Sequence, residues 1–245
     1  MPKPISEQTF LKNYRIHDYD IPLVSVDMTI FTVWDGQLQA LLVKRHEHPE
    51  LGKWALPGGF VDLERDKTLA DTARRKLAEK TGVDTPYLEQ VESVGNADRD
   101  PRGWSVTIAY FALLAHQNIQ PQGSDGAEEV CWVPVPTIKA RYALAFDHQR
   151  ILDSCHLRLR SKVQYTSLPV NLMPTEFTLS ELQSTFEIIL GSPVEKKSFR
   201  RRITDAQILE ESGGMRTGSN RPAKLYRVKP DCERHFFVRN LEGPR

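Results

Sequence analysis

The apolar positions in the first half of the chain alternate between strand-like and helix-like patterns. Residues 21–33 and 38–44 are rich in β-branched and apolar side chains, and Asp35-Gly36 between them is typical of a type I′ hairpin turn. Residues 68–80 instead repeat apolar side chains every four positions, which predicts an amphipathic helix. Further strands are predicted at 91–95, 105–114 and 130–135. We therefore expect an α+β domain with a mixed sheet.

The second half of the chain begins with helical patterns. A helix is predicted from about Asp147 to Arg160, and a strand-like apolar run follows at 163–170. Thr178 and Glu181 have the spacing of a capping box, in which the two side chains satisfy free backbone donors at the start of a helix. The apolar face of this helix stops at Gly191, which predicts its end.

A second, strongly basic helix is predicted to begin between Pro193 and Ser198 and to end at Gly213-Gly214. Residues 215–228 then predict a hairpin with a polar tip at 218–220. A helix fits the DNA major groove, and a hairpin beside it can contact phosphates or the minor groove. The order of helix, turn, basic helix and basic hairpin therefore predicts a winged helix-turn-helix. The apolar stripe of the basic helix is Phe199, Ile203, Ala206 and Leu209.

The length of the chain and the distribution of charge along it both indicate two domains. A chain of 245 residues favours two domains, and we expect one over 1–146 and another over 166–245, connected by 147–165. Residues 1–159 hold 18 basic and 22 acidic side chains, whereas residues 160–245 hold 15 and 10. Residues 196–229 alone hold ten basic and three acidic side chains, which indicates a polyanionic partner. The alternative is a solvated basic face without a partner.

Other features of the composition narrow the class of protein. Cys131, Cys155 and Cys232 are too few and too widely spaced for a disulfide framework or a Cys-x-x-Cys metal site, so we expect buried, reduced thiols. No signal-peptide pattern or membrane-length apolar run is present, and we expect a cytoplasmic protein without a membrane partner. His46-Glu47-His48 lacks acidic partners at metal-ligand spacing and is interpreted as a surface loop.

Residues 58–83 carry the most distinctive motif in the chain. Gly58-Gly59 precedes a helix with Arg75, Leu77 and Glu79 on it, and Gly82-Val83 closes the motif. The arrangement resembles the Nudix box, with two extra residues between Gly59 and Thr68. In the intact box, carboxylates three and four residues apart share one helix face and hold a cation such as Mg²⁺.

Two of the three acidic positions of that box carry lysine here. The family's Arg-Glu-hydrophobic-x-Glu-Glu-x-Gly corresponds to residues 75–82, so Lys76 and Lys80 replace glutamates. Pyrophosphate hydrolysis needs a bound metal to neutralise charge and activate water. We therefore expect no required cofactor, no metal ligands and no catalytic residues. We also hypothesise that one or both lysines supply the positive charge of the metal; the alternative is that they decorate an exposed helix face.

The whole chain, from about Tyr19 to Val228, resembles the NrtR family of Nudix-related transcriptional repressors of NAD metabolism. The C-terminal part of this resemblance lies in residues 177–191, 199–203 and 221–228. It implies an α/β/α Nudix sandwich that binds ADP-ribose or a related NAD-derived nucleotide, and a winged helix that binds a palindromic operator as a homodimer. Two other functions stay open: an active ADP-ribose pyrophosphatase with an accessory basic domain, and a Nudix protein that binds RNA.

Candidate ligand-binding residues are those able to grip phosphates, stack on adenine or allow close backbone approach. Structural turns, core packing and helix capping are the alternative roles for these positions. The candidates are Arg45, Trp54, Gly58, Gly59, Phe60, Lys76, Lys80, Arg99 and Arg102. Candidate DNA-binding residues lie on the exposed side of the basic helix and on the hairpin. They are Lys197, Arg200, Arg201, Arg202, Thr204, Arg216, Arg221 and Lys224.

Overall fold

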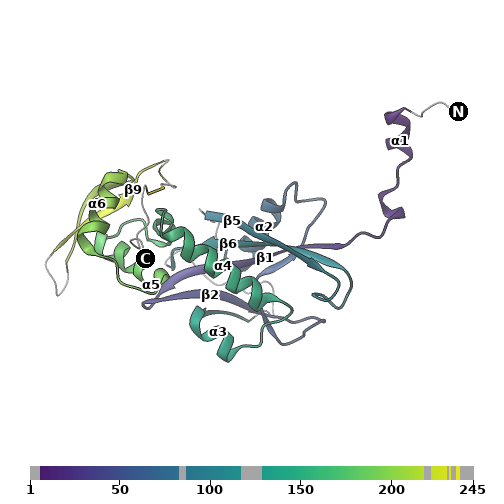
Figure 1. Cartoon of the computed structure of the whole chain (residues 1–245), viewed down its shortest axis with the longest axis horizontal. Coiled ribbons are helices and arrows are strands. Elements are labelled where there is room, and N and C mark those ends of the chain that lie inside the picture. The colour runs from purple at the N-terminus through teal and green to yellow at the C-terminus, as the bar shows by residue number, and fades with distance from the viewer. Residues whose placement is uncertain are drawn as a thin grey trace.

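The N-terminal segment projects away from the rest of the chain (Figure 1). The computed structural model describes residues 6–82, 87–116, 129–217, 222–230, 232 and 236–237. Helix α1 (Glu7–Asn13) and the 3-10 helix η1 (Ile16–Asp18) bury no residue of their own. Neither was predicted from the apolar pattern, because a helix without a buried face has no apolar stripe to reveal it.

A mixed sheet forms the centre of the N-terminal domain. Strand β1 (Leu23–Trp34) pairs antiparallel with β2 (Gln37–Lys44) and β4 (Gly58–Phe60), and parallel with β6 (Ser105–Leu113). At its edges, β2 pairs with β3 (Trp54–Ala55) and β7 (Val130–Pro134), and β6 pairs with β5 (Tyr87–Asn96). The predicted turn between β1 and β2 is confirmed, since Asp35 and Gly36 have φ angles of 49° and 68°.

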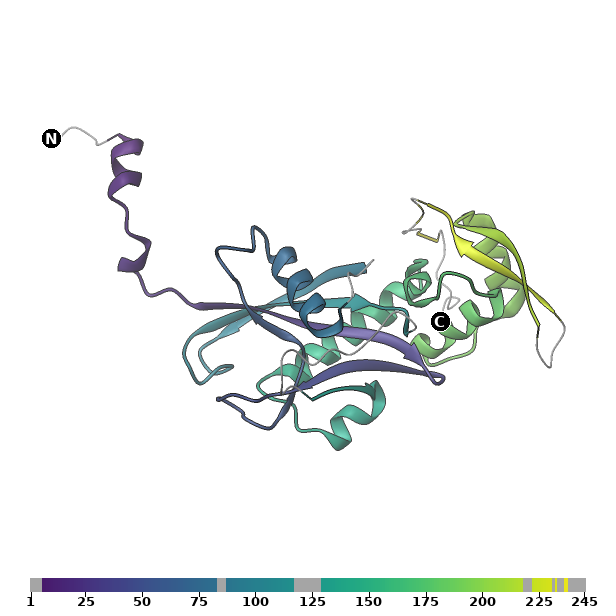
Figure 2. The ribbon, with the colours of Figure 1, turned by 180° about the vertical axis from the view of Figure 1, so that it is seen from behind.

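Helices cover both faces of the sheet, as the predicted sandwich requires. Alternate residues of a strand face opposite sides, and Val26, Met28 and Ile30 pack with Ala73 and Leu77 of α2 (Leu69–Thr81). The opposite face packs on α4 (His148–Val163), and Figure 2 shows α2 and α4 on the two sides. A short helix, α3 (Val135–Arg141), begins where the sequence predicted the last strand residue.

The C-terminal domain is the predicted winged helix-turn-helix. After the 3-10 helix η3 (Leu168–Leu172) come α5 (Leu179–Leu190) and α6 (Lys196–Ala206). Strands β8 (Leu209–Arg216) and β9 (Ala223–Val228) form the hairpin beside them. The capping box of Thr178 and Glu181 is confirmed, and α5 ends at Gly191 in a left-handed conformation with a φ of 68°.

Two sequence predictions in this half were wrong. No strand covers 163–170: α4 continues to Val163, whose side chain extends the buried stripe of Cys155 and Leu159 by one further turn. The basic helix ends at Ala206, because Gln207 adopts a left-handed φ of 52°. Gly213-Gly214 lies instead inside β8, where the pairing with β9 shifts register and the φ of Gly213 is 85°.

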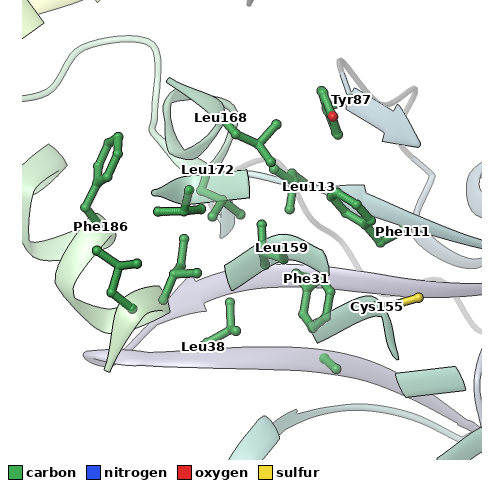
Figure 3. Close-up of a cluster of buried hydrophobic side chains, with 14 of the residues drawn as sticks. Phe31, Leu38, Tyr87, Phe111, Leu113, Cys155, Leu159, Leu168, Leu172 and Phe186 are labelled. Atoms are coloured by element: carbon green, nitrogen blue, oxygen red, sulfur yellow. The ribbon is translucent and has the colours of Figure 1, made fainter. Parts of the chain in front are cut away.

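One hydrophobic core joins the two domains. It runs from the sheet residues Phe31 and Phe111 through Leu159 of α4 to Leu172 and Phe186, all of them buried (Figure 3). α4 contacts the sheet along its length and α5 and η3 at its far end. The segment predicted as a connecting helix is therefore also a central part of the core.

Candidate ligand cleft and nucleic-acid face

A cleft of about 270 Å³ opens between the end of β2, β4, α2 and the loop that follows β5. Six of its lining residues are basic and three are acidic, which favours an anionic occupant. Eight of the nine predicted ligand-binding residues line it. They are Arg45, Gly58, Gly59, Phe60, Lys76, Lys80, Arg99 and Arg102.

Trp54 is the predicted ligand-binding residue that does not line the cleft. Its ring packs edge-on against Tyr142, with centroids 5.7 Å apart and an interplanar angle of 87°. The reason is strand alternation: Ala55, the next residue in β3, lines the cleft, so Trp54 faces the other way. Core packing, the alternative role for this tryptophan, is the one the structure shows.

The two lysines of α2 both face the cleft. Lys76 Nζ lies 2.9 Å from Glu79 Oε2, so its ammonium group pairs with the glutamate that remains from the acidic set. The Lys76 stem crosses Gly59 so closely that a Cβ there would be 2.7 Å from its Cε atom. Lys80 is buried, with 8% of its surface exposed, and burial and the charge of Lys76 lower its pKa. These side chains therefore do not decorate an exposed helix face.

Arg75 ties the lengthened loop to the helix. Its Nη2 and Nε atoms donate to Asp66 at 2.5 and 2.8 Å, and its Nη1 atom donates to Glu79 at 3.2 Å. The hydrogen bonds from Arg75 hold the pKa of Asp66 well below its usual value. Burial alone would raise the pKa of Glu79, but the hydrogen bonds and charges of Lys76 and Arg75 outweigh it and lower that pKa.

These pairings leave a donor set that does not suit a divalent cation. Glu79 is shared between a guanidinium and an ammonium group, and Asp66 accepts from Arg75 and Thr72. Over the ranges that the structure describes, no three His, Cys, Asp or Glu side chains cluster in a way that could hold a metal ion. A hard cation needs several free oxygen ligands, and the paired carboxylates of Asp66 and Glu79 do not offer them.

A buried charge network forms the floor of the cleft. Arg99 Nη2 lies 3.4 Å from Asp27 Oδ2 and 2.9 Å from Asp147 Oδ1, and 5% of the Arg99 side chain is exposed. His148 Nδ1 accepts from the Leu56 N–H at 2.9 Å, so its Nε2 atom, 3.6 Å from Asp27 Oδ1, carries the proton of the neutral ring. Burial lowers the pKa of His148, which favours that neutral form.

Arginine side chains stacked on aromatic rings form the outer wall. The Arg102 guanidinium lies 4.9 Å from the centroid of Phe60, and that of Arg45 lies 4.8 Å from the centroid of Phe146. Arg102 is also held by Asp100, 2.7 Å from its Nη2 atom. Burial and the charge of Arg102 lower the pKa of Arg45. The wall thus offers cations that are already oriented.

Several lining residues were missed by the sequence reasoning. His46 and His48 are exposed, as a surface loop predicts, yet they also form part of the rim. Asp27, Phe146 and His148 come from a strand interior and a helix start, without a motif that marks them. An aspartate within a strand-like run of mainly apolar and β-branched residues was the one available signal, since a charge that such a strand buries needs a partner.

Helix α6 presents a basic face to solvent. Phe199 and Ile203 are buried on its inner side, whereas the predicted groove-facing residues are exposed. Those residues are Lys197, Arg200, Arg201 and Thr204. The α6 sequence holds five basic residues and one acidic residue among its 11 residues. Arg202 is half-buried, so it lies toward the edge of this face.

The hairpin cations are less available than their sequence suggests. Lys224 Nζ lies 2.7 Å from Glu211, which raises the Lys224 pKa, and Arg216 lies 3.6 Å from Glu181 on α5. Arg221 and the predicted tip at 218–220 lie outside the described residues. Among the residues of this domain that the structure describes, exposed basic side chains therefore concentrate on α6.

Two predictions from composition can also be compared with the structure. Cys155 is buried, and burial raises its pKa to about 12, whereas Cys131 and Cys232 are half-buried. All three thiols are free. Among the helices that the structure describes, none is long and apolar enough to cross a membrane.

Comparison with known proteins identifies the family. Residues 25–155 match the NUDIX domain, and residues 169–228 match the NrtR DNA-binding winged helix domain. An ADPR-responsive transcriptional repressor, NtrR, of Acinetobacter baylyi is 51% identical over 240 residues, which span 98% of this chain and 95% of the relative.

Two solved structures of Shewanella oneidensis NrtR agree with this match. The complex with a 27mer DNA has a TM-score of 0.84 and 46% identity, over 89% of this chain and 99% of that one. Its NUDIX domain complexed with ADP-ribose has a TM-score of 0.59 and 44% identity, over 63% of this chain and 99% of that one. The chain belongs to the NrtR family of ADP-ribose-responsive transcriptional repressors, in which a Nudix domain precedes a DNA-binding winged helix.

Proposed function

We propose that this chain represses genes of NAD metabolism, with ADP-ribose or a related nucleotide as its effector. Residues 1–146 act as the sensor, 147–165 as the connection and 166–245 as the DNA-binding domain. The observation that carries the proposal is the cleft with six basic lining residues in the same chain as a basic, exposed α6. The complexes of Shewanella oneidensis NrtR with ADP-ribose and with DNA support the assignment of the cleft to a nucleotide and of α6 to DNA.

The cleft is suited to a nucleotide with a diphosphate. Arg99 and Arg102 come from one loop, and Lys76 and Lys80 come from the facing helix, so cations approach the occupant from two sides. Charged donors form the strongest hydrogen bonds to phosphate oxygens. Phe60, which is 43% exposed, offers a ring at the mouth of the cleft. These groups are the ones we assign to effector binding.

The nucleotide binds without efficient hydrolysis. The Lys76 ammonium group occupies the neighbourhood of Glu79 in which the Nudix reaction needs a cation, and it cannot activate a water molecule as a metal does. The double substitution Lys76→Glu, Lys80→Glu should therefore weaken ADP-ribose binding and raise Mg²⁺-dependent turnover. Arg74→Glu, an exposed charge reversal on the same helix, is the matched control.

Two results would contradict this assignment. Efficient Mg²⁺-dependent hydrolysis of ADP-ribose by the wild-type protein would make the chain an active pyrophosphatase. Unchanged ligand affinity together with nil turnover in the double variant would show that the lysines contribute nothing to the site.

DNA recognition is assigned to α6 in a homodimer. Two-fold symmetry places the two α6 helices on half-sites of a palindrome, about one or more helical turns apart. ADP-ribose then favours one arrangement of the DNA-binding domains, because a ligand shifts only an equilibrium whose states it binds differently. A typical coupling of roughly 1–3 kcal/mol changes DNA affinity about 5- to 150-fold.

A gel shift tests this assignment directly. The probes are the DNA upstream of the protein's own gene and duplexes from promoters of NAD biosynthesis, at one stated salt concentration, with and without ADP-ribose. We expect preferential binding to a palindromic duplex and a change in affinity when ADP-ribose is added. Preference for single-stranded RNA, or no response to ADP-ribose, would contradict the proposed function.

A further inference from the structure

The ion pair of Arg99 and Asp147 joins the floor of the cleft to the start of α4. Arg99 lines the cleft, and its Nε and Nη2 atoms donate to the two oxygens of Asp147 at 3.2 and 2.9 Å. Asp147 is not among the residues that line the cleft. It is the N-cap residue of α4, yet its side chain makes no capping hydrogen bond. Its carboxylate holds Arg99 instead of the helix backbone.

The residues on either side of Asp147 both face the cleft. Phe146, which lies beneath the Arg45 guanidinium, has a left-handed φ of 52°. His148, the first residue of α4, accepts a hydrogen bond from Leu56 and lies near Asp27. Phe146 and His148 therefore line the cleft where α4 begins, and Asp147 between them binds Arg99, so movement of the cleft wall involves the start of the helix.

The helix α4 carries such movement to the DNA-binding domain. Its 16 residues span about 24 Å at a rise of 1.5 Å per residue. Ile151, Cys155, Leu159 and Val163 are buried along one side, which makes the helix move as a packed unit. Its far end contacts α5 and η3, and Figure 3 shows Leu159 in the same cluster as Leu172 and Phe186 of that region.

We propose that an anionic effector competes with Asp147 for the Arg99 guanidinium and, by loosening the start of α4, repositions the DNA-binding domain. This inference rests on the proposed function. Arg99 already shares one positive charge between the carboxylates of Asp27 and Asp147. A diphosphate adds stronger acceptors beside the same guanidinium, and the pair with Asp147 is the contact that leads out of the cleft.

Asp147→Asn tests the inference, because it removes the charge and keeps the shape. The variant should mimic the protein whose ion pair has been broken by ligand. Without ADP-ribose, it should bind the operator duplex with the affinity of ADP-ribose-saturated wild type. Because the carboxylate no longer competes for Arg99, the affinity of the variant for ADP-ribose should rise, within the range of about 5- to 150-fold that typical couplings span. A merely structural role would lower the affinity for both partners.

Two variants provide the comparison. Asp153→Asn removes an exposed carboxylate from the same helix and should retain the wild-type response. Asp147→Glu keeps the negative charge and should retain a large part of the wild-type response to ADP-ribose. The measurements are calorimetric titration with ADP-ribose and fluorescence anisotropy with operator DNA, on the full chain.

Three outcomes would overturn the inference. In the first, Asp147→Asn keeps both the DNA affinity and the ADP-ribose response of wild type. In the second, the variant loses affinity for both partners, which indicates structural damage. In the third, wild type itself binds ADP-ribose and DNA without coupling; that result refutes the proposed function, and this inference with it. The wild-type measurement alone distinguishes the third case from the first two.

Discussion

Arg201→Ala is the sharpest test of α6 as the recognition helix. The Arg201 side chain is exposed, whereas Phe199 and Ile203 hold the opposite side of the helix in the core. Alanine and arginine are both good helix formers, so the substitution should leave the fold unchanged. The substitution removes a contact with DNA, and the loss of binding free energy depends on which part of the duplex the guanidinium reaches.

The two kinds of contact have different magnitudes. An arginine that reads a base edge contributes about 1–3 kcal/mol, or about 5- to 150-fold in affinity for each half-site. An arginine that neutralises a phosphate lowers the slope of log K against log salt by about 0.9, and by about 1.8 when both protomers lose it. Loss of affinity with an unchanged slope therefore indicates a base contact, and loss of slope indicates a phosphate contact.

Fluorescence anisotropy on the palindromic duplex, between about 50 and 200 mM salt, measures both quantities. Arg160→Ala, which removes an exposed arginine from α4, is the matched control and should change neither. ADP-ribose binding should remain at its wild-type value in both variants. If Arg201→Ala and Arg160→Ala bind DNA equally well, with equal slopes, α6 is not the recognition helix.

Three further predictions concern the cleft. Gly58→Ala places a Cβ 2.3 Å from Asp27 Oδ1 and 2.5 Å from the Val26 carbonyl oxygen, so β1 and β4 must separate. We expect urea denaturation to show a free energy of unfolding about 1–3 kcal/mol below that of wild type. An unchanged urea midpoint would contradict this. The pKa of Lys80 lies below 10.5, so its ammonium group loses its proton earlier than an exposed lysine as the pH rises. In calorimetric titrations, the ADP-ribose affinity of wild type should therefore begin to fall at a lower pH than that of Lys80→Arg. Identical pH profiles would contradict the role of Lys80. Because burial lowers the pKa of His148 below 6.5, the unfolded chain protonates this imidazole before the folded chain does as the pH falls. The free energy of unfolding should therefore drop by up to about 1.4 kcal/mol per pH unit below 6.5. Denaturation of His148→Gln should show a weaker dependence of stability on pH, and equal dependences in variant and wild type would contradict the role of His148.

Local patterns predicted the elements whose signal lies within a few neighbouring residues. The hairpin at Asp35-Gly36 and the capping box at Thr178 depend on backbone chemistry inside one turn, and both are confirmed. The strand predicted at 163–170 does not form, because its apolar residues are buried by tertiary packing in the end of α4 and in the 3-10 helix η3. An apolar run of that length has no period that separates a strand from other buried segments.

The cleft shows the same limit. Motif residues such as Gly58 and Lys76 were identified because they keep the spacing of the Nudix box. Asp27 and His148 are 121 positions apart in the chain, and nothing in the sequence relates them. Their side chains meet because the mixed sheet and α4 bring them together, which is information that a single sequence does not hold. Trp54 shows the converse, since its neighbour in β3 is the residue that faces the cleft.

The single core also determines how the chain opens. Leu159 and Leu172 pack in one cluster with Phe186, so exposing the inside of the winged helix also strips apolar cover from the Nudix sheet. Amide groups in α5 and α6 then exchange with solvent mainly through openings that disturb both domains. If the opened state does not bind the nucleotide, a ligand in the distant cleft raises the free energy of those openings by about 2.7 kcal/mol at a concentration 100 times its Kd. Hydrogen exchange in the DNA-binding helices would thus report on a ligand that never touches them.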